Sequence, residues 1–212
     1  MAITINGNGT ITGIIAGGLP SVAVTPADGS ITTAKLANNA VTTAKTTGLQ
    51  RRVSTTITLP TDAGEITHNI TTGVKKIEIV LANVSGTGNT NLHIQVNDGG
   101  NYANSGYGHA MGYHSNSATG QEGQTSNSTG AFATYGLNSD SYQIYGKWEL
   151  NNPHGNTWTS DHVLWGSAAS NHQFWGTGYY TLPNTITRFK FYVGSGNFDS
   201  GYLTVIETMG DD

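Results

Sequence analysis

Two tryptophans in a polar stretch are the residues with the clearest capacity for chemistry. Trp158 and Trp165 lie in residues 151–171, among asparagine, serine, threonine and histidine side chains. Aromatic faces beside amide and hydroxyl groups can stack on sugar rings and hydrogen-bond to their hydroxyls. These residues therefore predict a glycan-binding surface, and we assign His162 and Tyr113 to the same surface.

The alternative is that the tryptophans pack in a core or between subunits, since tryptophan is highly buried on average. This interpretation is favoured for Trp148 and Trp175, which lie inside strand-like patterns. For Trp158 and Trp165 both interpretations stay open.

Histidines and carboxylates are numerous enough to raise metal binding and catalysis. His109 and His114 share one polar stretch, but neither they nor the other histidines follow an HExxH or HxH pattern. We therefore predict no metal site, although a trimer could gather three copies of one histidine at its axis. Glu149 and Asp161 are the carboxylates considered as a glycosidase pair, which would need a defined separation across a cleft. With no nucleophile motif or phosphate-binding loop, we predict a protein that is not an enzyme and has no cofactor.

Composition excludes several other classes of function. The net charge is −4 with only nine lysines and arginines, so there is no basic surface for nucleic acid. Cysteine is absent, which excludes disulfides and thiolate metal sites. The first 18 residues lack a basic region and a continuous apolar run, so we predict neither a signal peptide nor membrane insertion.

Residues 53–212 predict an antiparallel β-sandwich. Apolar and polar residues alternate in seven segments, and Gly/Asn turns separate them. The segments are 53–59, 74–84, 90–97, 143–150, 172–182, 186–193 and 198–207. With further strands expected within 107–136, about eight strands in two sheets indicate an all-β, jelly-roll-like head domain. The residues expected to face its core are Ile77, Ile79, Leu81, Leu92, Ile94, Val96, Phe189, Phe191, Val193, Leu203 and Val205.

Two glycine- and asparagine-rich regions interrupt these segments. Residues 101–142 are expected to form an extended exposed loop or a pair of hairpins, and residues 151–171 a second loop. Loops held on a rigid sandwich often carry recognition.

Residues 1–52 contain no aromatic residue and cannot build a core of their own, so we predict an extended N-terminal arm and stem that packs on something else. One or two strands are expected around the turn at residues 6–9. The arm is predicted to dock on another protein or, alternatively, to cross to a neighbouring subunit. Its anchoring residues are Ile3, Ile5, Ile11, Ile14 and Ile15. A short Thr-Thr-Ala-Lys repeat follows, and in a trimer its apolar residues would face the axis. These stem residues are Ile31, Leu36 and Val41.

Three segments resemble bacteriophage fibre proteins: the opening MAITINGNGTITGI, the linker ADGSITTAKLANNAVTTAKTTGLQ, and the closing hairpin PNTITRFKFYVGSGNFDSGYLTVIE. The resemblance implies a homotrimer on the virion surface, attached to a tail or capsid protein through residues 1–52, with a head that binds host-surface glycan. The alternative is a capsid decoration or cement protein that stabilises the phage head. A glycan-cleaving enzyme is a third possibility, which would need convergent carboxylates in a groove.

Overall fold

A computed structural model describes residues 52–88, 91–115, 121–134, 142–167 and 172–210, together with two short strands near the N-terminus. Internal contacts divide the chain into two units, Met1–Thr47 and Gly48–Asp212. In the first unit, β1 and β2 pair antiparallel on either side of the predicted turn. The side chains of the predicted arm and stem lie outside the described residues.

The described strands are all antiparallel to their neighbours. In chain order they are β1 (Thr4–Ile5), β2 (Ile11–Thr12), β3 (Arg52–Thr58), β4 (Glu65–Asn69), β5 (Val74–Gly86), β6 (Leu92–Asn97), β7 (Tyr107–Ser115), β8 (Gln121–Thr129), β9 (Phe132–Ala133), β10 (Gln143–His154), β11 (Thr157–Ser167), β12 (His172–Thr181), β13 (Arg188–Val193) and β14 (Phe198–Met209).

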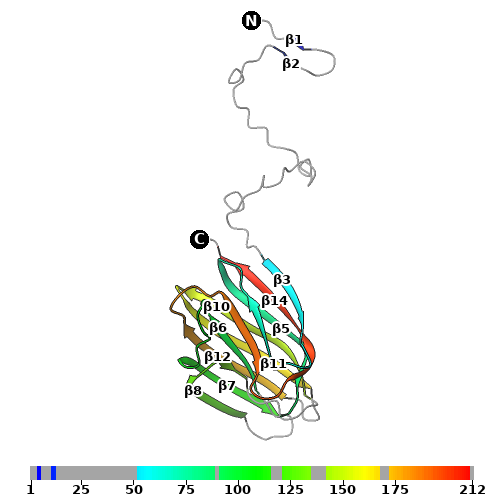
Figure 1. The fold of residues 1–212 in the computed structure, drawn as a ribbon, viewed down its shortest axis with the longest axis vertical. Helices are drawn as coiled ribbons and strands as arrows, with labels where there is room; N and C mark the ends of the chain where they lie inside the picture. Colours follow the sequence, from blue (N-terminus) through cyan, green and yellow to red (C-terminus); the bar gives the residue numbers. More distant parts are fainter. Residues whose placement is uncertain are drawn as a thin grey trace. The chain divides into compact units, whose positions relative to one another are not determined.

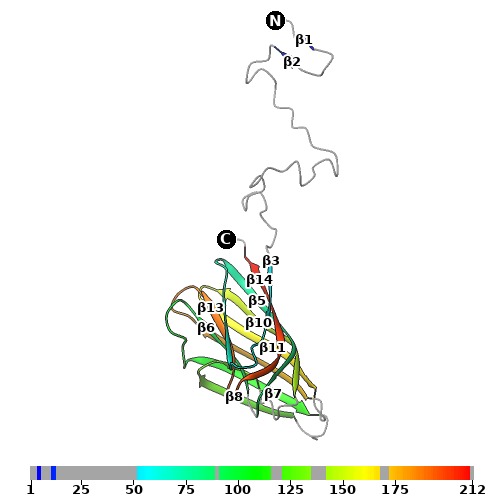
Figure 2. The same ribbon diagram turned by 45° about the vertical axis from the view of Figure 1, so that its right-hand side comes forward.

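The second unit is a sandwich of two sheets, which confirms the predicted fold class at that level. The large sheet has eight strands in the order β3-β14-β5-β10-β11-β12-β7-β8, and the small sheet has four in the order β4-β13-β6-β9. Figures 1 and 2 show the strands of the small sheet layered against those of the large one. The large sheet therefore has one face toward the core and one outer face.

Period-two alternation explains the core. All eleven residues predicted to face inward are buried, with exposed fractions of 5% or less. Trp148 also lies in the core, and its indole N–H donates to Ser160 Oγ at 2.7 Å. A buried indole needs such an acceptor because an unsatisfied donor is costly. The packing predicted for Trp148 is confirmed.

A buried carboxylate links the two sheets. Glu207 on β14 is 2% exposed, and its Oε1 lies 3.0 Å from His68 Nε2 on β4. Its Oε2 accepts a hydrogen bond from the backbone N–H of Thr71 at 3.2 Å. Both oxygens are thus satisfied, as burial of a polar group requires.

The loop predicted for residues 151–171 is wrong over most of its length. Strand β10 runs through Asn151 to His154, and β11 occupies Thr157–Ser167. A tight turn joins them, with Gly155 at a φ of 55° and the Asn152 side-chain amide donating to the Gly155 carbonyl at 2.8 Å. Residues 151–171 are rich in polar side chains because one face of β11 is directed outward, not because the segment is a loop.

The region 101–142 also holds strands, as one of its two interpretations expected. Strands β7 and β8 pair in register from Tyr107↔Thr129 to His114↔Gln121, with one irregularity after Tyr107. The short strand β9 follows and joins the small sheet beside β6. The β7–β8 hairpin extends the large sheet by pairing β7 with β12.

A candidate interaction face on the large sheet

Large apolar side chains gather on the outer face of the large sheet. Among the described residues, all six exposed large hydrophobic side chains lie on strands of this sheet, at positions that alternate with core residues. They are Val80, Tyr145, Val163, Trp165, Tyr179 and Tyr202. Scattered exposed apolar residues need no explanation, but a set confined to one face marks an interaction site. We call this surface the outer face.

The register of the strands places these residues in rows across the sheet. Val80 pairs with Lys147, Lys147 with Val163, and Val163 with Trp175. A second row joins Tyr145, Trp165 and Gln173. Neighbours in a row point to the same side of the sheet, so the rows form a continuous surface.

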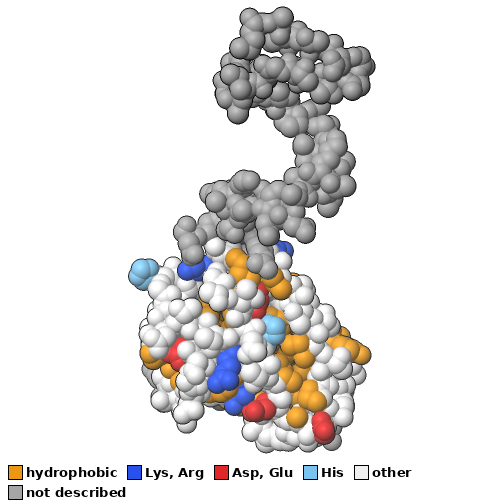
Figure 3. All heavy atoms as spheres, turned by 45° about the horizontal axis from the view of Figure 1, so that its top comes forward, with side chains coloured by type: hydrophobic (Ala, Val, Ile, Leu, Met, Phe, Trp, Pro, Cys, Tyr) orange, Lys and Arg blue, Asp and Glu red, His pale blue; other side chains and the backbone are white. Residues whose placement is uncertain are grey.

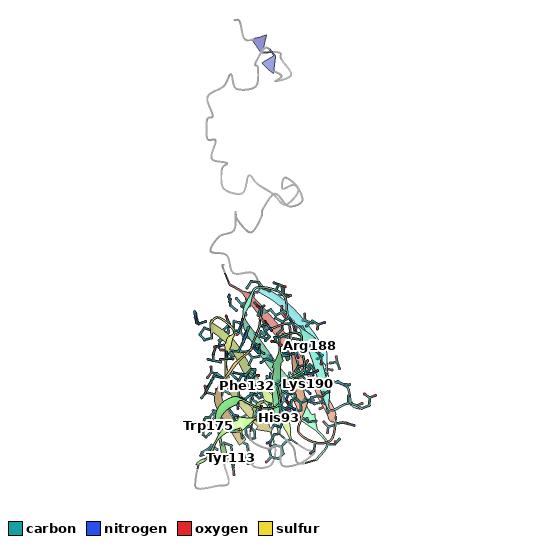
Figure 4. All side chains as sticks on the ribbon, turned by 60° about the vertical axis from the view of Figure 1, so that its left-hand side comes forward. His93, Tyr113, Phe132, Trp175, Arg188 and Lys190 are labelled. Atoms are coloured by element: carbon teal, nitrogen blue, oxygen red, sulfur yellow. The ribbon has the colours of Figure 1, made fainter. Side chains whose placement is uncertain are left out.

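The opposite side of the sandwich differs in chemistry. On the small sheet, the outward positions of β13 are Arg188, Lys190 and Tyr192, and Lys190 lies 3.2 Å from Glu65. The Lys190 ammonium also lies 5.0 Å from the centre of the Tyr102 ring. In Figure 4, Trp175 lies on one side of Phe132, and Arg188 and Lys190 lie on the other. Within the described part of the sandwich, the exposed large apolar side chains therefore belong to the side formed by the large sheet.

Two hollows mark the outer face near Trp175. The larger has a volume of about 830 Å³ and is lined by Lys147, Glu149, Asp161, Val163, Trp175, Thr177 and nearby backbone of β7, β11 and β12. The smaller, of about 470 Å³, is lined by His114, Val163, Gln173 and Trp175. Val163 and Trp175 line both hollows.

A ladder of charges runs beside the apolar residues. Glu78 Oε2 lies 2.7 Å from an Arg52 nitrogen, and its Oε1 lies 3.7 Å from the ammonium groups of Lys76 and Lys147. Glu149 contacts Lys147 and lies 3.2 Å from Lys76. The hydrogen bond to Glu149 and its charge raise the pKa of Lys147, and the same bond lowers the pKa of Glu149. Both groups are thus held in their charged forms.

This ladder does not have the character of a hydrolytic acid–base pair. Glu149 and Asp161 are direct cross-strand neighbours on β10 and β11. A glycosidase acid needs a raised pKa so that it is protonated at neutral pH. Lysine contacts lower the pKa of Glu149 instead. The arrangement favours binding over proton transfer.

Three of the four residues assigned to glycan binding point into the sandwich. Trp158 is 2% exposed and His162 is 5% exposed. Tyr113 is partly buried against the core and lies 5.7 Å from the His172 ring. The rings of Trp158 and His162 are therefore enclosed in the sandwich, and the ring of Tyr113 is partly enclosed. Trp165, at 47% exposed, is the member of the set that reaches the outer face.

Other residues of the outer face were missed or assigned to packing. Trp175 was expected to pack in the core or between subunits; it is half-buried and lines both hollows. The signal available in the sequence was the run Val163-Leu164-Trp165, which has apolar residues in both phases of a strand. A strand that is apolar on both faces is covered on both faces or exposes an interaction surface.

Behind the outer face, the core contains an imidazole without a hydrogen bond at one nitrogen. Nε2 of His162 has no hydrogen-bond partner among the described residues, and the ring packs 4.5 Å from the Trp148 ring. Burial lowers the pKa of His162 to about 3, with a smaller contribution from His109. Burial likewise lowers the pKa of His93 to about 4. These side chains are therefore neutral at physiological pH.

Within the described ranges, no cluster of three or more histidine, aspartate or glutamate side chains could hold a metal ion. The same part of the chain contains no helix of the length and hydrophobicity that crossing a membrane requires.

The described strands define an all-β sandwich of two antiparallel sheets. A scan against protein-family models finds no match to the chain, and a search of curated proteins finds no similar sequence.

Proposed function

We propose that this protein is a non-enzymatic structural component of a bacteriophage virion, a trimeric fibre on the virion surface. Residues 1–52 would attach it to another virion protein, and the sandwich would form the projecting head. The resemblance of the arm, linker and closing hairpin to phage fibre proteins supports this proposal. The observation that carries it furthest is the concentration of exposed apolar side chains on one face of the head.

We further infer that the head is jelly-roll-like. If the inserted hairpin β7–β8 and the pair β11–β12 are set aside, the sheets have the orders β3-β14-β5-β10 and β4-β13-β6-β9. Eight antiparallel strands remain, in two four-stranded sheets, and the chain alternates between the sheets except at β6 and β9, which are neighbours in the small sheet. This order supports a jelly roll, and both insertions extend the same sheet.

Host-surface glycan remains the proposed target of such a fibre, but the geometry gives it little support. Three of the four residues expected to bind sugar are directed inward, and Trp165 is the member of the set that is exposed on the outer face. Assembly therefore has the stronger physical basis.

The test is to image purified virions with a label directed at residues 53–212. Label confined to the tail would support a fibre. Label spread over the icosahedral head would favour the decoration alternative. A virion preparation that contains the particle but no label would refute the proposal.

A further inference from the structure

We propose that a second copy of this chain packs on the outer face of the large sheet. The head exposes Val163 at 60%, Tyr179 at 59% and Tyr202 at 50%, on three different strands. This inference deepens the proposed function: the assembly of three copies is taken from the proposed fibre. The assignment of the contact to the outer face depends only on the structure of the head.

The first argument is the extent of the surface. Neighbouring strands lie about 4.8 Å apart, so the five strands from β14 to β12 span about 19 Å and the whole sheet about 34 Å. A stable protein interface buries about 800 Å² on each partner, a patch about 28 Å on a side. The whole sheet, at about 34 Å, is thus wide enough for such a patch, and the strands that carry the apolar residues span more than half of its width.

The second argument is charge. Among the described residues, the outer face carries three cations, Arg52, Lys76 and Lys147, and three carboxylates, Glu78, Glu149 and Asp161. A face with balanced charge can pack against another copy of the head without net repulsion. A nucleic acid or a strongly charged protein would instead require an excess of one sign.

The third argument is the state of the polar groups. The carboxylates of Glu78 and Glu149 already contact lysine and arginine side chains of the same face. These ion pairs balance the carboxylate charges within the face, and each carboxylate oxygen can still accept a further hydrogen bond. Lys147 itself lies in the row between Val80 and Val163, so a protein partner would meet paired charges interspersed with apolar side chains.

The hollows give the surface relief for packing. Val163 and Trp175 line two spaces of about 830 and 470 Å³, which can receive side chains that protrude from the partner. Large aromatic residues anchored in pockets contribute most of the energy of protein interfaces. Trp165 and Tyr145, side by side across β10 and β11, are suited to this role.

The experiment uses the absence of cysteine from the chain. A single cysteine is introduced into the full-length protein by Val163→Cys, on the outer face, or by Asn69→Cys, at an exposed position of the small sheet. Both variants are labelled with a small maleimide under native conditions. If a second copy covers the outer face, Cys at position 163 is labelled at least tenfold more slowly than at position 69, and dilution that dissociates the complex removes the difference.

Equal labelling rates in the native assembly would overturn the proposal, even if residues 1–52 hold the chain together as a trimer. Protection of position 163 that develops only when a host polysaccharide is added would also overturn it and assign the face to glycan. Sedimentation of the Val163→Glu variant is the second measurement. A trimer as stable as the parent, three times 22.2 kDa, would count against the proposal, with Asn69→Glu as the matched control. If the imaging label does not bind to virions but the maleimide still reacts slowly at position 163, the phage assignment is refuted and the proposed interface is retained.

Discussion

Acid should destabilise the head through His162, and the size of the effect follows from its burial. In the unfolded chain this imidazole titrates near 6.5, whereas in the fold its pKa is lowered to about 3. The folded state therefore excludes a proton that the unfolded state binds, and stability falls as the pH drops from about 6.5 towards the folded-state value. At pH 5 the loss of stability from this one residue is about 2 kcal/mol. The reason is that pH 5 lies about 1.5 units below the pKa of the imidazole in the unfolded chain, and each unit corresponds to about 1.4 kcal/mol.

The assay is chemical denaturation of the full chain at pH 7.5 and pH 5.0, for the parent protein and for His162→Leu. The leucine variant should lose about 2 kcal/mol less stability between the two pH values. It should also tolerate the change at neutral pH, since the replaced Nε2 makes no hydrogen bond within the described residues. His154→Gln, at an exposed position of β10, is the control and should keep the pH dependence of the parent. An unchanged pH dependence in His162→Leu would refute the assignment of a neutral, buried imidazole.

Three further substitutions test the packing of the sandwich by the same denaturation assay. Glu207→Ala should cost about 2–3 kcal/mol of stability because it leaves His68 and the backbone N–H of Thr71 without an acceptor. The control is Glu65→Ala, which removes an exposed carboxylate and should cost under about 0.5 kcal/mol. Ser160→Ala should cost about 1–3 kcal/mol by stranding the indole N–H of Trp148, and a loss near zero would show that the indole has another acceptor. Gly176→Ala should cost about 1–3 kcal/mol, since its methyl group would lie 2.4 Å from the imidazole discussed above; a variant as stable as the parent would contradict that close packing.

The fold was predictable because its signal is local and repeated. Alternation in segments such as 186–193 and 74–84 identifies both a strand and the face of it that is buried. The buried positions of Ile77, Phe189 and Leu203 follow directly from that alternation. The order of strands in the sheets was not predictable, because β12 pairs with β7 across a long separation in sequence.

The candidate site could be predicted only in part, for a related reason. Trp158 and Trp165 lie in the same polar stretch and look alike in sequence, but their odd separation places them on opposite faces of one strand. The odd separation of the two tryptophans assigns them to opposite faces only if the segment is a strand. Because 151–171 was interpreted as a loop, the separation could not be used. Trp175 shows the converse: its strand was identified, but which of the two phases faced the core depended on the neighbouring strands.

The outer face has a consequence for the order of events in assembly. Its apolar residues come from Val80 to Tyr202, so strands distant in sequence must pair in register before the surface exists. A chain with a missing or misregistered strand would present a broken set of side chains to its neighbours. Association through this face would then select for completely folded heads, and incorporation into a particle would itself act as a check on folding.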